Sequence, residues 1–129
     1  MLTARDMMTE NVTTITRDCS VQDAIELMLS RGVSGLPVID DSGHLTGIVT
    51  EFALLAIAYD HQVTGDSVAD HMTTDVLTIE ADQPLSQAAD LCIAHRVRRV
   101  PVMENGRLVG LISRRDVLKA LYENAAALA

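Results

Sequence analysis

The chain has 129 residues, which fits one compact domain or two very small ones, and 48% of them are apolar, enough to form a core. Aromatic residues make up only 2%, so the core must be aliphatic. The net charge of −8 argues against non-specific binding to nucleic acid or to anionic membranes. The start of the chain lacks a signal-peptide pattern, and no stretch approaches the roughly 20 apolar residues of a membrane span. We therefore expect a cytoplasmic protein.

The sequence repeats itself. Met8-Thr9 matches Met72-Thr73, and Pro37-Val38 matches Pro101-Val102, both pairs at an offset of 64. After a one-residue deletion the offset becomes 63, and Gly47 then matches Gly110. We assign residues 1–63 to a first copy and residues 64–129 to a second. Two copies are too few for a solenoid, so a closed pseudo-symmetric pair is expected.

The first copy reads as a strand, a helix, a hairpin and a second helix. Its expected elements are a strand at 12–15, a helix at 20–31, hairpin strands at 36–39 and 45–49, and a helix at 51–60. Ser20 is a good N-cap with Asp23 three residues later, which predicts a capping box. One face of that helix is apolar, with Val21, Ala24, Ile25 and Met28 at helical spacing.

The second copy repeats this order after a polar link at 61–70. Its expected elements are a strand at 76–79, a helix at 84–95, hairpin strands at 100–103 and 108–112, and a helix at 114–125 that tails off in alanines. Pro84 suits the start of the first of these helices, whose apolar face is formed by Leu85, Ala88, Ala89 and Cys92. Asn105-Gly106 supplies the positive φ angles of a tight type I′ turn.

The fold class expected from this order is α/β, with two β-α-β-β-α repeats. One repeat of about 60 residues buries too little apolar surface to be secure alone. Two repeats packed through their sheets, with pseudo-twofold symmetry, would bury both aliphatic faces. A cleft between the repeats is then the expected place for a ligand.

The basic residues are concentrated in the second copy. Six of the ten fall within one twenty-residue window: Arg96, Arg98, Arg99, Arg107, Arg114 and Arg115. They either form part of a solvated surface or create a local anion site on an otherwise acidic protein. Arginine forks suit phosphate oxygens, so the second interpretation predicts a phosphorylated ligand.

The pattern Ser113-x-x-Asp116 at the start of the last helix allows two interpretations. A serine N-cap with an acidic residue at N3 resembles a capping box, which stabilises a helix by about 1 kcal/mol. A helix N-terminus also presents free N–H groups to phosphate. A carboxylate one turn into the helix can accept hydrogen bonds from two vicinal hydroxyl groups, as on ribose. The two roles are compatible.

The matching position of the first copy has lost the carboxylate. Thr50 keeps the capping hydroxyl, but Ala53 has no acceptor, and Glu51 would disfavour phosphate there. We therefore expect two unequal sites, with the one at Thr50 and Ala53 degenerate.

Other chemistry is not indicated by the sequence. Cys19 and Cys92 have no CxxC spacing, which favours unpaired thiols in a reducing compartment. The four histidines are dispersed, so no metal site is expected. The sequence contains no nucleophile-elbow or phosphate-loop pattern, so we expect no catalytic residues and no enzyme.

Two stretches carry a resemblance to a known family. VSGLPVIDDSGHLTGIVTEFA and VRRVPVMENGRLVGLISRRD follow the same order of Val, Pro-Val, Gly-x-Leu-x-Gly and a final hydroxyl. That order resembles the CBS domain, and the similarity covers nearly the whole chain. A pair of CBS domains is called a Bateman module. The resemblance implies regulation through an adenine nucleotide such as AMP, ADP or ATP, with S-adenosylmethionine or NADH possible.

The resemblance also implies roles for individual residues. Asp116 would bind ribose and Ser113 would lie beside the phosphate, with Arg99 or Arg98, and next Arg115, facing the phosphate groups. The adenine would lie near the opposite copy, at Val33, Ser34 and Gly35, and near its leading segment from Thr9 to Thr14.

Two functions from different classes follow. The first is a ligand sensor that passes its state to an effector protein not identified by the sequence. The second is a ligand-independent dimerisation or scaffold module, since members of this family commonly form homodimers through their helices. The amphipathic helices at 20–31, 51–60, 84–95 and 114–125 could supply that surface.

Overall fold

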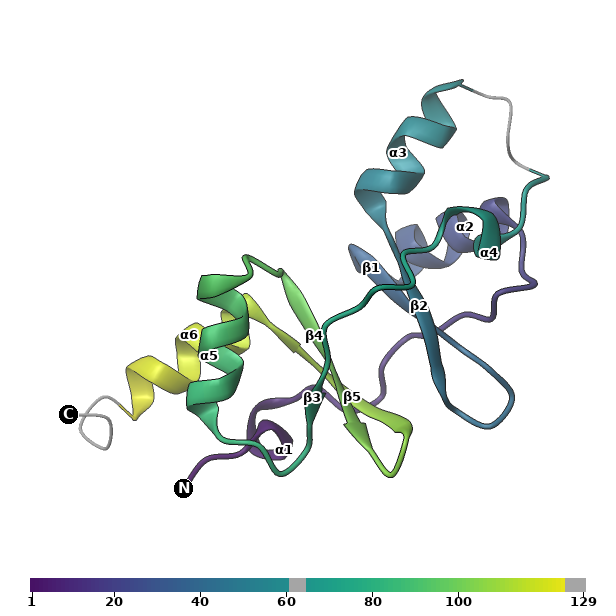
Figure 1. Ribbon diagram of the computed structural model, residues 1–129. Helices are drawn as coiled ribbons and strands as arrows, with labels where there is room; N and C mark the ends of the chain where they lie inside the picture. Colours follow the sequence, from purple (N-terminus) through teal and green to yellow (C-terminus); the bar gives the residue numbers. More distant parts are fainter. Residues whose placement is uncertain (61–64, 125–129) are drawn as a thin grey trace. The chain divides into compact units, whose positions relative to one another are not determined.

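The computed structural model describes residues 1–60 and 65–124. The chain forms two compact units that are not two continuous halves of the sequence. Unit 1 combines Met1–Val12 with Leu77–Ala129, and unit 2 consists of Thr13–Val76. Each unit has its own aliphatic core. The predicted α/β architecture with two repeats of helices and strands is confirmed (Figure 1).

Unit 2 is built on a two-stranded antiparallel sheet. Its elements are α2 (Val21–Arg31), β1 (Gly35–Ile39), β2 (Leu45–Thr50), α3 (Glu51–Asp60) and α4 (Val68–His71). Gly35 pairs with Thr50 at the open end of the β1–β2 hairpin. Ile15 adds one parallel bridge to Val38. The core is formed by Ile15, Val21, Ala24, Met28, Leu36, Val38, Val49, Leu54 and Val68.

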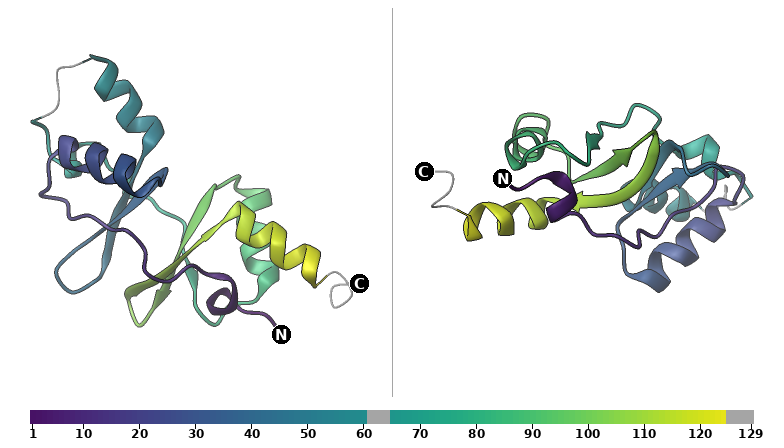
Figure 2. Two further views of the ribbon diagram at one scale, coloured as in Figure 1. Left: turned by 180° about the vertical axis from the view of Figure 1, so that it is seen from behind. Right: turned by 90° about the horizontal axis from the view of Figure 1, so that it is seen from below.

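Unit 1 has a three-stranded sheet in the order β3-β4-β5. Its elements are α1 (Ala4–Met7), β3 (Ile79–Glu80), α5 (Leu85–Ala94), β4 (Arg99–Glu104), β5 (Arg107–Ser113) and α6 (Arg114–Glu123). β3 runs parallel to β4, and β4 runs antiparallel to β5. α5 contacts β4, α6 contacts β5, and the two helices contact each other. The purple N-terminal segment lies beside the yellow α6 (Figure 2).

The segment that leads into each repeat packs in the unit formed by the other repeat. Thr9 makes two backbone hydrogen bonds with Leu111 of β5, and Thr73 makes two with Ile48 of β2. Each segment starts with a short capped helix, where the Thr3 N–H donates to Asp6 and the Ser67 N–H donates to Asp70. Both units therefore combine a hairpin repeat with the leading segment of the other repeat, which lies far away in sequence in unit 1 and follows α3 in unit 2.

Two glycines allow the leading segments to lie close against the hairpin strands. A Cβ atom at Gly110 would lie 2.3 Å from the Met8 sulfur, and a Cβ atom at Gly47 would lie 2.7 Å from the Thr73 carbonyl oxygen. Each glycine lies beside the register shift of its hairpin, and its lack of a side chain permits this close approach. Met8 and Met72 are partly buried and pack against the cores of their units.

The helix predictions are largely confirmed. Ser20 caps α2 and accepts a hydrogen bond from the Asp23 N–H, and Val21, Ala24 and Met28 are buried. Asn105 and Gly106 have the predicted positive φ angles, 52° and 79°. The helix predicted at 114–125 ends at Glu123. The predicted alanine tail lies outside the described residues after Asn124.

The leading strands were predicted less well. The strand expected at 12–15 is wrong, because only Ile15 makes a bridge. The strand expected at 76–79 is displaced to Ile79–Glu80. The polar link expected at 61–70 contains α4 in its described part, while residues 61–64 lie outside the description. The leading segments contain only single bridges, one two-residue strand and short helices. Such elements are too short to produce a periodic pattern in the sequence.

Candidate functional site

The N-terminus of α6 carries a complete capping box. The Ser113 side-chain oxygen accepts a hydrogen bond from the Asp116 N–H at 3.2 Å, and the Ser113 N–H donates to Asp116 Oδ2 at 2.8 Å. The capping interpretation of this pattern is thereby confirmed. The capping hydrogen bond leaves further acceptor positions on the Asp116 carboxylate, since its two oxygens offer about four. Both side chains are half-buried at the end of β5.

The sheet places arginine beside this helix start. Arg99 is the register partner of Ser113, so the first residue of β4 lies directly opposite the cap residue of α6. The Arg98 carbonyl accepts a hydrogen bond from the Arg114 N–H. Arg99 is half-buried and Arg98 is exposed. The structure thus brings together Ser113, Asp116 and the two arginines that the sequence predicted for phosphate.

The two arginines that open α6 differ in their surroundings. The Arg114 guanidinium turns back to the loop before β4 and donates to the carbonyls of Val97 and Arg96. It therefore holds the loop that leads to Arg98 and to Arg99 at the start of β4. Arg115 is exposed and lies three residues before Leu118, on the outer face of the helix. Its predicted contact with phosphate stays a prediction.

Thr9 lies in the same unit as Asp116. Its backbone pairs with Leu111, two residues before Ser113 on β5. Thr14 lies in unit 2, next to the bridge between Ile15 and Val38. The predicted leading segment is therefore divided between the two units, and its Thr9 end shares a unit with Ser113.

Unit 2 presents the corresponding helix start without the charged groups. The Thr50 side-chain oxygen accepts a hydrogen bond from the Ala53 N–H at 3.3 Å, so the hydroxyl half of the cap is kept. The Ala53 side chain cannot return the second hydrogen bond. Gly35 stands opposite Thr50, where unit 1 has Arg99 opposite Ser113. The degenerate second site expected at Thr50 and Ala53 stays a prediction.

The remaining predicted adenine contacts also lie in unit 2. Val33 is half-buried and packs against the core of unit 2. The Ser34 carbonyl accepts a hydrogen bond from the Glu51 N–H at 2.9 Å, and Gly35 is buried in β1. Their predicted contact with adenine stays a prediction.

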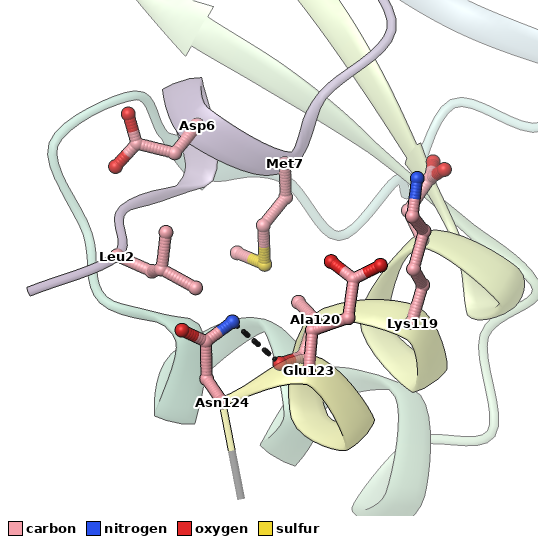
Figure 3. Close-up of a pocket in the computed structure, with 8 residues that line it drawn as sticks. Leu2, Asp6, Met7, Lys119, Ala120, Glu123 and Asn124 are labelled. Atoms are coloured by element: carbon pink, nitrogen blue, oxygen red, sulfur yellow. Dashed lines mark hydrogen bonds between the residues drawn. The ribbon is translucent and has the colours of Figure 1, made fainter. Parts of the chain in front are cut away.

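A hollow between α1 and α6 was not predicted. Its volume is about 190 Å³, and it is lined by Leu2, Asp6, Met7, Asp116, Lys119, Ala120, Glu123 and Asn124 (Figure 3). Met7 extends from α1 toward α6, and the Asn124 amide donates to the Ala120 carbonyl. The hydrogen bond from the Thr3 backbone N–H is the largest cause that lowers the pKa of Asp6, and a second hydrogen bond from the Thr3 side chain adds to it. The Thr3-x-x-Asp6 spacing is the sequence signal that could have placed a helix here.

The cysteines and histidines do not form a second site in the described part of the chain. Cys19 and Cys92 are free thiols, and burial raises the pKa of Cys92. His71 pairs with Asp66 at 2.8 Å within unit 2. No cluster of three or more potential metal ligands occurs among residues 1–60 and 65–124. None of the described helices has the length and apolar character needed to cross a lipid bilayer.

Comparison with known proteins settles the family. The profile of the CBS domain matches residues 4–60 and, a second time, residues 68–123. The chain belongs to the CBS domain family. Its two CBS repeats resemble those of CBSX2 from Arabidopsis thaliana, whose crystal structure in complex with AMP shares 34% sequence identity and a TM-score of 0.87, covering 97% of this chain and 99% of that one.

The CBS pair also occurs within longer proteins. This chain is 32% identical over 117 residues to the uncharacterized protein MJ1225 of Methanocaldococcus jannaschii, covering 91% of the chain and 42% of that protein. It is 36% identical over 117 residues to inosine-5′-monophosphate dehydrogenase of the same organism, covering 90% of the chain and 23% of the enzyme. The chain thus spans less than half the length of these two relatives.

Proposed function

We propose that this CBS pair binds an adenine nucleotide, with the ribose and phosphate held at the N-terminus of α6, and that it regulates a partner protein. The observation that carries the proposal is the complete cap of Ser113 and Asp116 in register with Arg99, which has no charged counterpart at Thr50 and Gly35. The AMP complex of the similar CBSX2 supports the choice of ligand class.

Each group has a distinct task in this proposal. Asp116 accepts hydrogen bonds from the two ribose hydroxyls while Oδ2 keeps its bond to the Ser113 N–H. The phosphate meets the positive end of the helix dipole, with Arg99 and Arg98 supplying charged donors and Arg115 a further candidate. Thr9, Thr14, Val33, Ser34 and Gly35 remain the proposed contacts of the base.

The ligand class can be tested by thermal shift with AMP, ADP, ATP, S-adenosylmethionine and NADH. A ligand at a hundredfold excess over its Kd stabilises the fold by about 2.7 kcal/mol, which raises the melting temperature measurably. The proposal predicts a shift with at least one adenine nucleotide. The absence of any shift at millimolar concentrations would contradict it.

Asp116→Ala tests the site itself and has a matched control. The variant loses hydrogen bonds to a charged group worth about 1.5–3 kcal/mol, so we expect affinity to fall about 10- to 100-fold in isothermal titration calorimetry. Asp23→Ala removes the N3 carboxylate of the same capping box in α2. The control should lose comparable stability and keep its affinity.

A second function, dimerisation without ligand, is favoured by a different observation. Large apolar side chains project into solvent from four helices, among them Leu29, Leu55, Ile93 and Leu118. We propose that these helices mediate a homodimer and that the CBS pair itself catalyses no reaction. Sedimentation would show a dimer without nucleotide. If dimerisation and partner binding survive Asp116→Ala unchanged, scaffolding rather than sensing is the function.

A further inference from the structure

Arg114 makes hydrogen bonds to three successive backbone carbonyls. Its side chain donates to the carbonyl of Arg96 at 2.5 Å and to that of Val97 at 2.9 Å, and its backbone N–H donates to that of Arg98 at 3.1 Å. These carbonyls belong to the loop between α5 and β4. We call the three hydrogen bonds the Arg114 clamp. The first residue of α6 thus holds the backbone that leads to Arg98 and to the start of β4.

The guanidinium of Arg114 lies toward α5 and the loop. Burial raises the pKa of the Cys92 thiol on α5, and the positive charge of Arg114 acts against this rise. Two of the three guanidinium nitrogens, Nε and Nη2, donate to the backbone of the protein itself. A carbonyl oxygen accepts such bonds without cancelling the charge, so the guanidinium also keeps the surroundings of the loop positive.

Arg96 has a backbone conformation that needs support. Its φ angle is 56°, in the left-handed region, which is uncommon for a residue other than glycine. The conformation is unfavourable because Cβ comes too close to the following carbonyl oxygen. Gly32, which stands 64 residues earlier, has a φ angle of 64° at the end of α2 and has no Cβ atom. The second repeat therefore holds with a side chain the conformation that the first repeat obtains from glycine.

Unit 2 has only the backbone part of the clamp. The Glu51 N–H donates to the Ser34 carbonyl at 2.9 Å, as the Arg114 N–H donates to the Arg98 carbonyl. An ionised carboxylate has no hydrogen to donate, so the Glu51 side chain cannot hold the preceding carbonyls. The side-chain part of the clamp thus occurs in the unit whose loop leads to two arginines.

We propose that Arg114 is a positioning residue for phosphate recognition, because it fixes the loop that carries Arg98 and leads to Arg99. The inference rests on the proposed nucleotide site and adds a residue that acts without touching the ligand. The Arg98 side chain is exposed, so its direction depends on the backbone that carries it. A binding group whose backbone is already ordered loses less conformational freedom when the ligand binds, which raises affinity.

Isothermal titration calorimetry with AMP and with adenosine tests this role. Arg114→Ala should bind AMP about fivefold more weakly, since the loop must then be ordered on binding. Adenosine, which lacks phosphate, should bind the variant and the unmodified protein equally. Arg5→Ala is the matched control, because it also removes one positive charge from unit 1, together with the ion pair to Glu104. The control should keep its affinity for both ligands.

A second substitution separates positioning from direct contact. In Arg96→Gly combined with Arg114→Ala, glycine can adopt the left-handed conformation without the clamp, as Gly32 does in unit 2. We expect this double variant to recover most of the AMP affinity that Arg114→Ala loses. An arginine that contacted the phosphate directly could not be replaced in this way.

The outcomes also separate this inference from the proposed function. If the unmodified protein binds no AMP, both are wrong. If it binds AMP, the nucleotide site stands, and positioning is overturned by any of three results with Arg114→Ala: unchanged AMP affinity, an equal loss for adenosine, or a loss that Arg96→Gly leaves unrepaired. Melting curves show which variants fold. If Arg114→Ala does not fold, Arg114→Lys, with and without Arg96→Gly, provides the same comparison, because one ammonium group cannot replace the two-pronged contact of the guanidinium.

Discussion

Units 1 and 2 start their closing helices with the same backbone arrangement and different chemistry. In both, a hydroxyl at the end of a strand caps the helix, and the first helical N–H donates to the carbonyl that precedes the partner strand. Unit 1 adds Asp116 and Arg99, whereas unit 2 has Ala53 and Gly35 in their places. Unit 2 forms its helix without these groups, so the capping hydroxyl and the backbone contacts are sufficient to start such a helix.

The comparison predicts a large effect of Arg99→Ala on phosphate recognition. The variant should bind AMP about 10-fold or more weakly, because a charge-assisted hydrogen bond contributes about 1.5–3 kcal/mol. Adenosine, which lacks phosphate, should bind the variant and the unmodified protein equally. Arg107→Ala, exposed at the start of β5, is the control in calorimetry. An equal loss for adenosine and AMP would assign Arg99 to the fold instead.

Gly47→Ala and Gly110→Ala should both destabilise the protein, but a second substitution in the leading segment should restore stability only for Gly110→Ala. Each should destabilise its unit by about 1–3 kcal/mol, since a new methyl group overpacks a tight contact. At Gly110 the obstacle is the Met8 side chain, so adding Met8→Ala should restore part of the lost stability. At Gly47 the closest atom is the Thr73 carbonyl oxygen, so Met72→Ala should not help.

Chemical denaturation would measure these losses. If Met72→Ala rescued Gly47→Ala as fully as Met8→Ala rescues Gly110→Ala, the backbone contact of Thr73 would not be the limiting one.

Ala53→Asp should make unit 2 more like unit 1 in stability but not in binding. The new carboxylate can accept from the Thr50 N–H and faces the positive end of the helix dipole, which stabilises α3 by about 0.5 kcal/mol. The melting temperature should rise slightly, and no second nucleotide should bind because Gly35 supplies no cation. A second site in calorimetry would show that the carboxylate alone is sufficient.

The smallest effects concern one exposed aspartate in each unit. Hydrogen bonds from the Thr3 backbone lower the pKa of Asp6, and one from the His44 backbone N–H, the largest cause, lowers the pKa of Asp40. A lowered folded-state pKa gives stability that is present above the unfolded value, about 3.9, and is lost as pH falls through the folded value.

Asp6→Ala and Asp40→Ala should therefore lower the melting temperature at pH 7 and differ less from the unmodified protein near pH 2. Melting curves across that range would measure the difference. A difference independent of pH would show that ionisation of these carboxylates does not contribute.

The sequence predicted the parts of the fold that repeat with a period. The α2 face, the two hairpins and the Ser113–Asp116 cap follow from spacing and turn residues, which act locally. The docking of Met8 on Gly110 could not be predicted, because it joins residues that are distant in sequence and depends on a missing side chain. α1 and α4 were missed since four residues are too few for an amphipathic pattern, although their Thr3–Asp6 and Ser67–Asp70 caps were visible.

The candidate site was predicted in its residue types and in part of its geometry. The Asn105-Gly106 turn alone would place Arg99 opposite Ile112, and only the register shift between Val102 and Met103 brings it opposite Ser113. The different task of Arg114, which holds the preceding loop through the carbonyls of Arg96 and Val97, has no signature in a run of arginines.

The inequality of the two helix starts is tested most directly by the stoichiometry of AMP binding in isothermal titration calorimetry. We predict one AMP per chain for the unmodified protein and for Ala53→Asp, and binding about 10- to 100-fold weaker for Asp116→Ala. Two equivalent AMP molecules per chain, or an affinity that Asp116→Ala leaves unchanged, would contradict the account.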